Sequence, residues 1–234
     1  MSSHDPGFQM TAELKRPGWL EIIVGVVAFF LLLIPTAVMV GYLQDQPVLQ
    51  GVVASTGGGT AGLGAFLLVY LLRIRSLAVF GFKSVSLRWL LAGAGLAVVG
   101  YGLSLLIQYG WLHFVGADQS QSVLHNAAQA GALAFTLSLI GGAVLTPLGE
   151  EFLFRGVVAN ALNRYGAWAG IGLSSVIFGL IHGVGVVLPV AIMVGVLSAI
   201  LFRKTGSVWP CVVLHAVYNA SQSLASALGS APMQ

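Results

Sequence analysis

The chain has 234 residues, of which 57% are hydrophobic and only 7% charged, and its mean hydropathy is +0.93. An ordinary soluble domain carries about 25% charged residues, so this composition excludes a soluble enzyme, a disordered protein and a nucleic-acid-binding protein, and it indicates that lipid is the solvent. The net charge of +3 rests on only ten lysines and arginines, and the single cysteine, Cys211, cannot form an intrachain disulfide.

Long apolar segments predict an all-α fold, a polytopic bundle of about seven transmembrane helices. A helix needs roughly 20 apolar residues to cross the bilayer, and such segments cover 19–43, 51–72, 89–110, 131–163, 167–187, 189–203 and 206–228. The fourth is too long for one straight crossing, so we expect Pro147 to kink it or to separate a shorter segment. Turn chemistry between Gly183 and Pro189 divides the fifth span from the sixth.

Lysine and arginine residues indicate how the spans are oriented in the cell membrane. They precede the first span and lie between spans two and three, four and five, and six and seven, which predicts a cytoplasmic N-terminus. The connection 73–88 is expected to be a cytoplasmic loop or surface helix, and 112–130 to lie along the outer membrane surface. Four regions follow: a cytoplasmic N-terminal tail (1–18), N-terminal transmembrane helices (19–130), a transmembrane core (131–228) and a C-terminal tail (229–234).

Several polar features are interpreted as structural. Residues 57–62 formally match GxGxxG, but they lie inside an apolar span with no preceding strand. Close helix packing through small residues is therefore the better interpretation. Four further side chains are interpreted as tail or interfacial residues without a function, namely His4, Glu21, His113 and His125.

One polar group lies inside the predicted spans and comprises Glu150, Glu151, Arg155, His182, His215 and Asn219. A charged residue at the bilayer centre costs roughly 2.5–3.5 kcal/mol, so a chain with so few charges needs a reason to place them there. At a helical rise of about 1.5 Å per residue, Glu150, His182 and His215 reach similar depths. They predict one site within the membrane, which we expect to open toward the cytoplasmic half.

Helical offsets suggest how these side chains pair. Glu151 and Arg155 are four residues apart with the glutamate first, the favourable order for an ion pair. Glu150 points about 100° away from Glu151, which leaves it without a partner nearby in the sequence and suits it to act as a general base. His215 and Asn219 share one helical face. A buried polar network that only fixes helix packing is the alternative, and the matched depth of the whole group favours a functional site.

Three motifs carry a resemblance to a known family. Glu150–Arg155 fit EExxxR, Phe178–His182 fit FxxxH and His215–Asn219 fit HxxxN. In this order, each within an apolar helix, they resemble the CAAX protease and bacteriocin-processing family, the type II CAAX prenyl endopeptidases. The resemblance covers about 130–225 and implies a polytopic helical intramembrane endopeptidase.

The resemblance also implies roles for the motif residues. Glu150 would activate a water molecule with the help of His182, while His215 and Asn219 would stabilise the oxyanion. Glu151 and Arg155 would hold the site in shape. Phe178, one turn before His182, is expected to form a wall of the pocket that contacts the substrate.

The resemblance leaves metal dependence open. Glu150, His182 and His215 could supply a zinc site with two histidines, one glutamate and an open position for water. Glu150 would then be a ligand, and another base would be needed. Asn219 is a poor zinc ligand but a good oxyanion donor, which favours activation of water without a metal.

The substrate and two rival functions also stay open. The expected partners are the bilayer and a membrane-associated peptide, either prenylated at its C-terminus or of another kind, such as a bacteriocin; the oligomeric state is not predicted. A small transporter or ion relay would use the same buried charges. A non-catalytic membrane scaffold that binds a partner protein would need them only for packing.

Overall fold

The structure of the protein is a computed structural model that describes residues 16–119 and 121–229. The described residues are largely helical and contain no strand, which confirms the all-α prediction. His4 and most of the predicted N-terminal tail lie outside the described residues, as do residues 230–234 of the predicted C-terminal tail.

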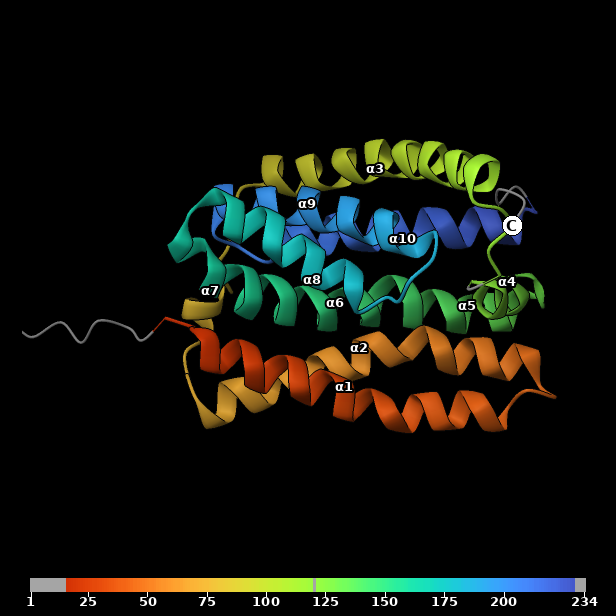
Figure 1. Cartoon of the computed structure of the whole chain (residues 1–234), viewed down its shortest axis with the longest axis horizontal. Helices are drawn as coiled ribbons and strands as arrows, with labels where there is room; N and C mark the ends of the chain where they lie inside the picture. Colours follow the sequence, from red (N-terminus) through yellow and green to blue (C-terminus); the bar gives the residue numbers. More distant parts are fainter. Residues whose placement is uncertain (1–15, 120, 230–234) are drawn as a thin grey trace, which may run out of the picture.

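Long helices lie side by side in one bundle (Figure 1). Five helical segments in the described part of the chain are long and apolar enough to cross a membrane: α1 (Trp19–Tyr42), α2 (Pro47–Leu72), α3 (Leu87–Phe114), the segment Ala132–Tyr165 and α9 (Val187–Thr205). A shorter apolar helix, Trp168–Leu180, and α10 (Trp209–Ala227) match the two remaining predicted spans. The described chain begins and finishes at opposite ends of the bundle, as an odd number of crossings requires.

The segment Ala132–Tyr165 is continuous but irregular. It runs through α5 (Ala132–Ile140), the π-helical turn η2 (Gly141–Leu145), α6 (Thr146–Glu151), the π-helix η3 (Phe152–Ala159), α7 (Asn160–Leu162) and the 3₁₀ turn η4 (Asn163–Tyr165). The N–H of Thr146 bonds to the carbonyl of Gly141, five residues back. Pro147 has no N–H to offer the next carbonyl, that of Gly142. The irregularity expected at Pro147 is thus a widened turn just before it.

The connections differ from the expectations in one respect. The link between α2 and α3 contains the 3₁₀ turn η1 (Leu77–Phe80), and its Phe80 is fully buried against the bundle rather than on a surface. The cause is that residues 77–82 of this connection are apolar. The ring of Phe82 also packs on Phe152, with the ring centroids 4.5 Å apart. At the same end of the bundle Glu21, 3% exposed, pairs with Arg73 at 3.2 Å.

The fifth span ends earlier than predicted. Its helix consists of the π-helix η5 (Trp168–Leu173) and α8 (Ser174–Leu180), so His182 lies in the turn before α9 rather than inside a helix. Gly183 in this turn has φ of +91°, a left-handed conformation that favours glycine. The break that the sequence placed here is therefore confirmed, although it begins a few residues sooner.

Glycines let α2 and α6 touch backbone to backbone. A Cβ atom on Gly59 would lie 2.5 Å from the carbonyl of Leu145, and one on Gly62 would lie 2.5 Å from the carbonyl carbon of Gly149. The hydroxyl of Thr146 accepts a hydrogen bond from the N–H of Gly59 (3.2 Å) and donates one to the carbonyl of Ser55 (3.0 Å). The small-residue interpretation of residues 57–62 is confirmed, and the contact sets the position of α6.

This contact predicts the effect of a single methyl group. A Cβ atom on Gly149 would lie 2.1 Å from the carbonyl oxygen of Gly59, and backbone cannot move aside as a side chain can. Gly149→Ala should reduce the free energy of unfolding by about 1–3 kcal/mol or more. The measurement is the thermal midpoint in detergent, which should fall. Gly95→Ala is the matched control, because a Cβ there meets nothing within 4 Å, and alanine favours a helix. Equal stability of the two variants would contradict the packing.

Candidate active site

The motif residues meet in the interior of the bundle. Glu150 and Glu151 come from α6, Arg155 from η3, and His215 from α10, together with Asn219 one turn further along. His182 joins them from the turn after α8. Glu150, His182, His215 and Asn219 line one cavity of about 350 Å³, and the structure therefore brings together the groups that the sequence places far apart.

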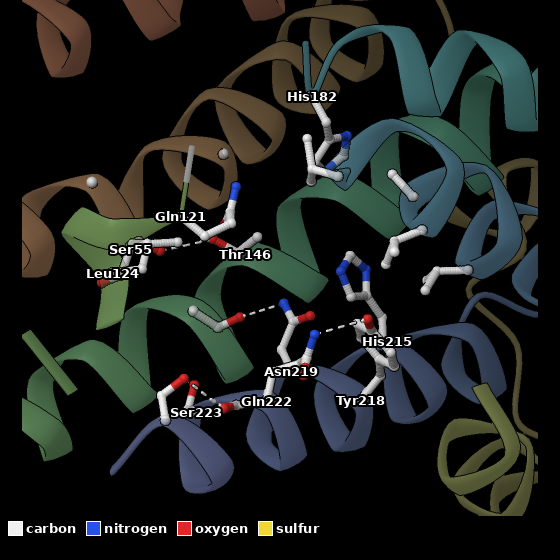
Figure 2. A pocket seen from close by; sticks show the side chains of 18 of the residues that line it. Ser55, Gln121, Leu124, Thr146, His182, His215, Tyr218, Asn219, Gln222 and Ser223 are labelled. Carbon is white, nitrogen blue, oxygen red and sulfur yellow. Dashed lines mark hydrogen bonds between the residues drawn. The ribbon is translucent and has the colours of Figure 1, made fainter. Parts of the chain in front are cut away.

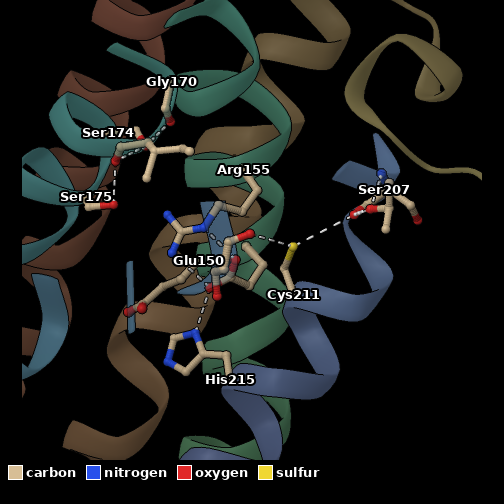
Figure 3. Close-up of polar contacts among 12 residues, drawn as sticks. Glu150, Arg155, Gly170, Ser174, Ser175, Ser207, Cys211 and His215 are labelled. Atoms are coloured by element: carbon tan, nitrogen blue, oxygen red, sulfur yellow. Dashed lines mark hydrogen bonds and ion pairs between the residues drawn. The ribbon is translucent and has the colours of Figure 1, made fainter. Parts of the chain in front are cut away.

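Glu151 is the centre of a buried ion network behind this cavity, and Figure 3 labels its partners Arg155 and His215. Its Oε2 atom lies 2.9 Å from Nε of Arg155, and its Oε1 atom lies 2.9 Å from Nδ1 of His215. Glu151 and Arg155 are both fully buried. The predicted pairing of Glu151 with Arg155 is confirmed, and Nδ1–H of His215 donates to the same carboxylate.

Glu150 faces a different direction from Glu151, toward His182. Its Oε2 atom is buried, makes no hydrogen bond within the described part of the chain and lies 3.7 Å from Nε2 of His182. Nδ1 of His182 is 2.7 Å from the carbonyl of Phe178. A carbonyl can only accept, so Nδ1 carries the proton and Nε2 of the neutral ring is an acceptor. Oε2 of Glu150 and Nε2 of His182 are thus both acceptors, and they are too far apart for a direct hydrogen bond. A molecule with two donor hydrogens can bridge them.

Glu150 also depends on a glycine of α2. A Cβ atom on Gly58 would lie 2.3 Å from Oε1 of Glu150, so a larger residue there would push the carboxylate out of this position. The glycine-rich stretch 57–62 therefore does more than pack helices, because Gly58 lies directly against the Glu150 carboxylate.

Asn219 bonds to the irregular turn of the fourth segment. Its Nδ2 atom donates to the carbonyl of Gly142 at 2.7 Å, the carbonyl for which Pro147 offers no N–H. Because the amide nitrogen carries two protons, one remains for a ligand in the cavity. The widened turn thus fixes the orientation of the Asn219 amide.

Phe178 packs against both histidines and the arginine. Its ring centroid lies 4.7 Å from that of His182 and 5.9 Å from that of His215, and the guanidinium carbon of Arg155 lies 4.7 Å from it. The ring lines the cavity but is only 1% exposed. Its contacts therefore hold the imidazoles in place more than they offer a surface to a substrate.

The three candidate zinc ligands do not converge. The Nδ1 atoms of His182 and His215 are occupied by Phe178 and Glu151, which leaves only the Nε2 atoms to bind a metal. Among the described residues, no three His, Cys, Asp or Glu side chains are placed to hold one ion. The donor set in this arrangement does not fit a three-ligand zinc site.

The cavity extends in a direction that the sequence did not predict. Its lining continues from Glu150 to α4 (Ser122–Gln129), which lies at the end of the bundle opposite η1 and α7 (Figure 1). The expected opening toward the Lys- and Arg-rich connections is therefore wrong. The physical reason is that His182 does not lie in the middle of a helix but follows the end of α8.

Sequence reasoning also missed part of the lining. His125, interpreted as an interfacial residue, faces the cavity, and so do Ser55, Gln108, Gln121, Ser138, Tyr218 and Gln222. Their signal in the sequence is weak, because single neutral polar residues are common in membrane helices. His113 does not line the cavity and stacks on Tyr109 near the end of α3.

Fold and site together define a polytopic helical membrane protein with one carboxylate and three imidazoles facing an internal cavity. Residues 132–221 match the family model described as type II CAAX prenyl endopeptidase Rce1-like. The chain is 26% identical over 219 residues to a protein of Bacillus subtilis (strain 168) named "Putative membrane peptidase YdiL", with 88% of this chain and 87% of that protein covered. No solved structure matches the chain. The matched segment contains all three motifs, and this part of the chain is similar to the type II CAAX prenyl endopeptidases.

The ion network predicts a stability defect that is separate from catalysis. Arg155→Ala would leave the Glu151 charge buried with one partner fewer, and removing one member of a buried ion pair costs about 3–5 kcal/mol. The thermal midpoint in detergent should therefore fall sharply. Lys204→Ala, an exposed basic residue near the end of α9, should stay within about 0.5 kcal/mol of wild type.

A double substitution tests whether the stranded charge causes this defect. Glu151→Gln combined with Arg155→Met removes both charges, so it should be more stable than Arg155→Ala alone. An Arg155→Ala protein as stable as wild type would contradict the pairing.

Proposed function

We propose that the chain is an intramembrane endopeptidase that hydrolyses peptide bonds of membrane-associated peptides. The observation that carries this proposal is the Glu150 carboxylate, whose Oε2 atom is buried without a hydrogen bond in the described structure and faces both His182 and the cavity. The similarity of residues 132–221 to a family described as prenyl endopeptidases and the name of the similar membrane protein support the same reaction.

The proposed nucleophile is a water molecule that donates to Oε2 of Glu150 and to Nε2 of His182. The 3.7 Å between these acceptors lets one water reach both. As the water oxygen attacks the carbonyl carbon, its proton passes to Glu150. The carbonyl π bond opens, its electron pair moves to the oxygen, and a tetrahedral oxyanion forms.

His215 and Asn219 are proposed to stabilise this oxyanion. The second amide proton of Asn219 is available for it, because the first bonds to Gly142. In its imidazolium form His215 keeps Nδ1–H on Glu151 and presents Nε2–H to the cavity. Protonated Glu150 then gives its proton to the leaving nitrogen as the carbon–nitrogen bond breaks, which releases a carboxylic acid and an amine.

We further propose that the protein lies in the cell membrane with its N-terminus in the cytoplasm. Arg16 stands at the bundle end where α1 begins, and Arg73 and Lys83 lie in the connection that follows α2, the side that positive residues favour. The α4 end of the bundle is then the outer end.

A transporter or ion relay is the second candidate, and the cavity supports it less. A path through the membrane needs openings at both ends of the bundle. The lining includes α4 residues at one end but none from the connections 73–86, 163–167 or 203–208 at the other. A closed inner end suits a reaction chamber better.

Glu150→Gln tests the base directly. The substitution conserves the shape of the side chain but removes its ability to accept a proton, so the cleavage rate should fall by about 10²–10⁴-fold with little change in thermal stability. Product mass spectrometry on a library of membrane peptides measures the rate. Glu21→Gln is the matched control, since Glu21 is also buried in a membrane helix but does not line the cavity.

Two outcomes would favour other functions. Proteoliposome flux that depends on Glu150, without peptide cleavage, would establish a transporter. A Glu150→Gln protein that retains the full cellular phenotype would establish a scaffold.

Metal dependence has its own test. If Glu150 and His182 activate water directly, purified protein should keep its activity in EDTA or phenanthroline, with zinc well below one per chain. Asn219→Ala should then cost about 2.7–4 kcal/mol of transition-state stabilisation with no change in metal content. Stoichiometric zinc that is lost in His215→Ala and required for turnover would overturn the metal-free mechanism.

A further inference from the structure

The cavity has two chemically different ends (Figure 2). His182 and His215 lie at one end, whereas Gln121, Leu124 and Ser223 lie at the other. The second part of the lining, which we call the α4 arm, is made of Gln108, Gln121, His125, Ser138, Gln222 and Ser223. The proposed mechanism uses none of these side chains.

The α4 arm is polar but carries no fixed charge. The described cavity lining contains no lysine, arginine or aspartate, and Glu150 is its only acidic residue. His125 belongs to α4, outside the membrane-spanning helices, and burial lowers its pKa below the usual value for histidine, which disfavours the charged ring. A charged ligand group would therefore find no counter-ion in the arm.

Two atoms in the arm make no hydrogen bond within the described part of the chain. They are Oγ of Ser138, whose residue is 7% exposed, and Nε2 of Gln108. Buried polar groups are nearly always paired, and leaving one unpaired is costly. The Ser138 hydroxyl can accept a hydrogen bond from an amide N–H or donate one to a carbonyl. Nε2 of Gln108 can donate a hydrogen bond to a carbonyl. The missing partners are thus those that a peptide main chain offers.

We infer that the α4 arm binds the main chain of an extended, uncharged peptide segment, which reaches Glu150 from the α4 end of the bundle. Because the opposite connections contribute nothing to the lining, the substrate chain continues out past α4. The arm has no cation for a free terminal carboxylate, so the bond that is cut is internal. This inference rests on the proposed endopeptidase function and names its substrate class and side of access.

The first test removes the unpartnered atoms. Ser138→Ala and Gln108→Met should each raise KM about five- to tenfold, the value of one hydrogen bond, while kcat stays within about twofold. Ser174→Ala is the control, because Ser174 is buried but lies outside the cavity lining, and it should leave KM unchanged. A fall in kcat with unchanged KM would overturn the binding role.

The second test compares ends of the substrate. The starting point is a peptide whose cleavage depends on Glu150. Shorter versions are made whose C-terminus falls within the arm, and each is prepared both as a free acid and as an amide. The amide should be cleaved at least about tenfold faster, since an uncompensated buried charge is strongly disfavoured. Equal or faster cleavage of the free acid would show that the site reads a terminal carboxylate.

The third test finds the side of access without using catalysis. Ser223→Cys is placed in a protein that also carries Cys211→Ser and Glu150→Gln, and a membrane-impermeant maleimide is added to proteoliposomes. Reference proteins carry Gln44→Cys, at the α4 end, or Ala78→Cys, at the opposite end. The Ser223→Cys protein should react from the same side as the Gln44→Cys protein, and bound peptide should slow its labelling.

The outcomes separate this inference from the proposed function. Labelling from the Ala78 side, or labelling that peptide does not slow, overturns the α4 arm even where Glu150-dependent cleavage persists. Absence of Glu150-dependent cleavage for every peptide overturns the endopeptidase function itself.

Discussion

A fully buried carboxylate shared between a guanidinium and an imidazole is the interaction on which the rest of this structure depends. Glu151 lies 2.9 Å from both Arg155 and His215. In a lipid environment an unpaired charge is expensive, so α10 must approach α6 closely enough to supply its histidine. That requirement also brings Asn219 to the cavity, because it lies one turn along the same helix.

The neighbouring carboxylate shows how one helix can hold two different acids. Glu150 and Glu151 are adjacent, so their side chains leave α6 in directions about 100° apart. Glu151 points to charged partners, whereas Glu150 points to the space left by Gly58 and toward a histidine whose facing nitrogen is an acceptor. The same backbone therefore places one group for stability and the other for chemistry.

The sequence allowed much of this to be predicted for a simple physical reason. Charges are so few in the apolar helices that Glu151 and Arg155, four residues apart, have almost no partner but each other. The all-α class, the irregularity near Pro147 and the glycine packing of residues 57–62 follow equally from local rules.

What the sequence did not reveal depends on contacts between distant segments. The depth of His182 was misjudged because the point where α8 ends at Leu180 is decided by the turn around Gly183, not by hydropathy. Burial of Phe80 follows from its fit against α2 and η3, which no periodicity describes. Gln108 and Ser138 carry no pattern at all, and only the cavity shows that they face the same space.

The two kinds of unsatisfied polar atom in the cavity suggest how binding and chemistry are divided. Oε2 of Glu150 lacks a hydrogen-bond partner near the histidines, and Ser138 and Gln108 lack partners in the α4 arm. A peptide that satisfies the arm gains binding free energy away from the reacting bond, and that energy can hold its carbonyl beside the water on Glu150. Since the arm contacts only main-chain groups in this view, it positions the substrate without demanding a particular side chain. Selection among membrane peptides would then rest on whether a segment can leave its own helix and extend, because a helical segment has no free amide or carbonyl to offer.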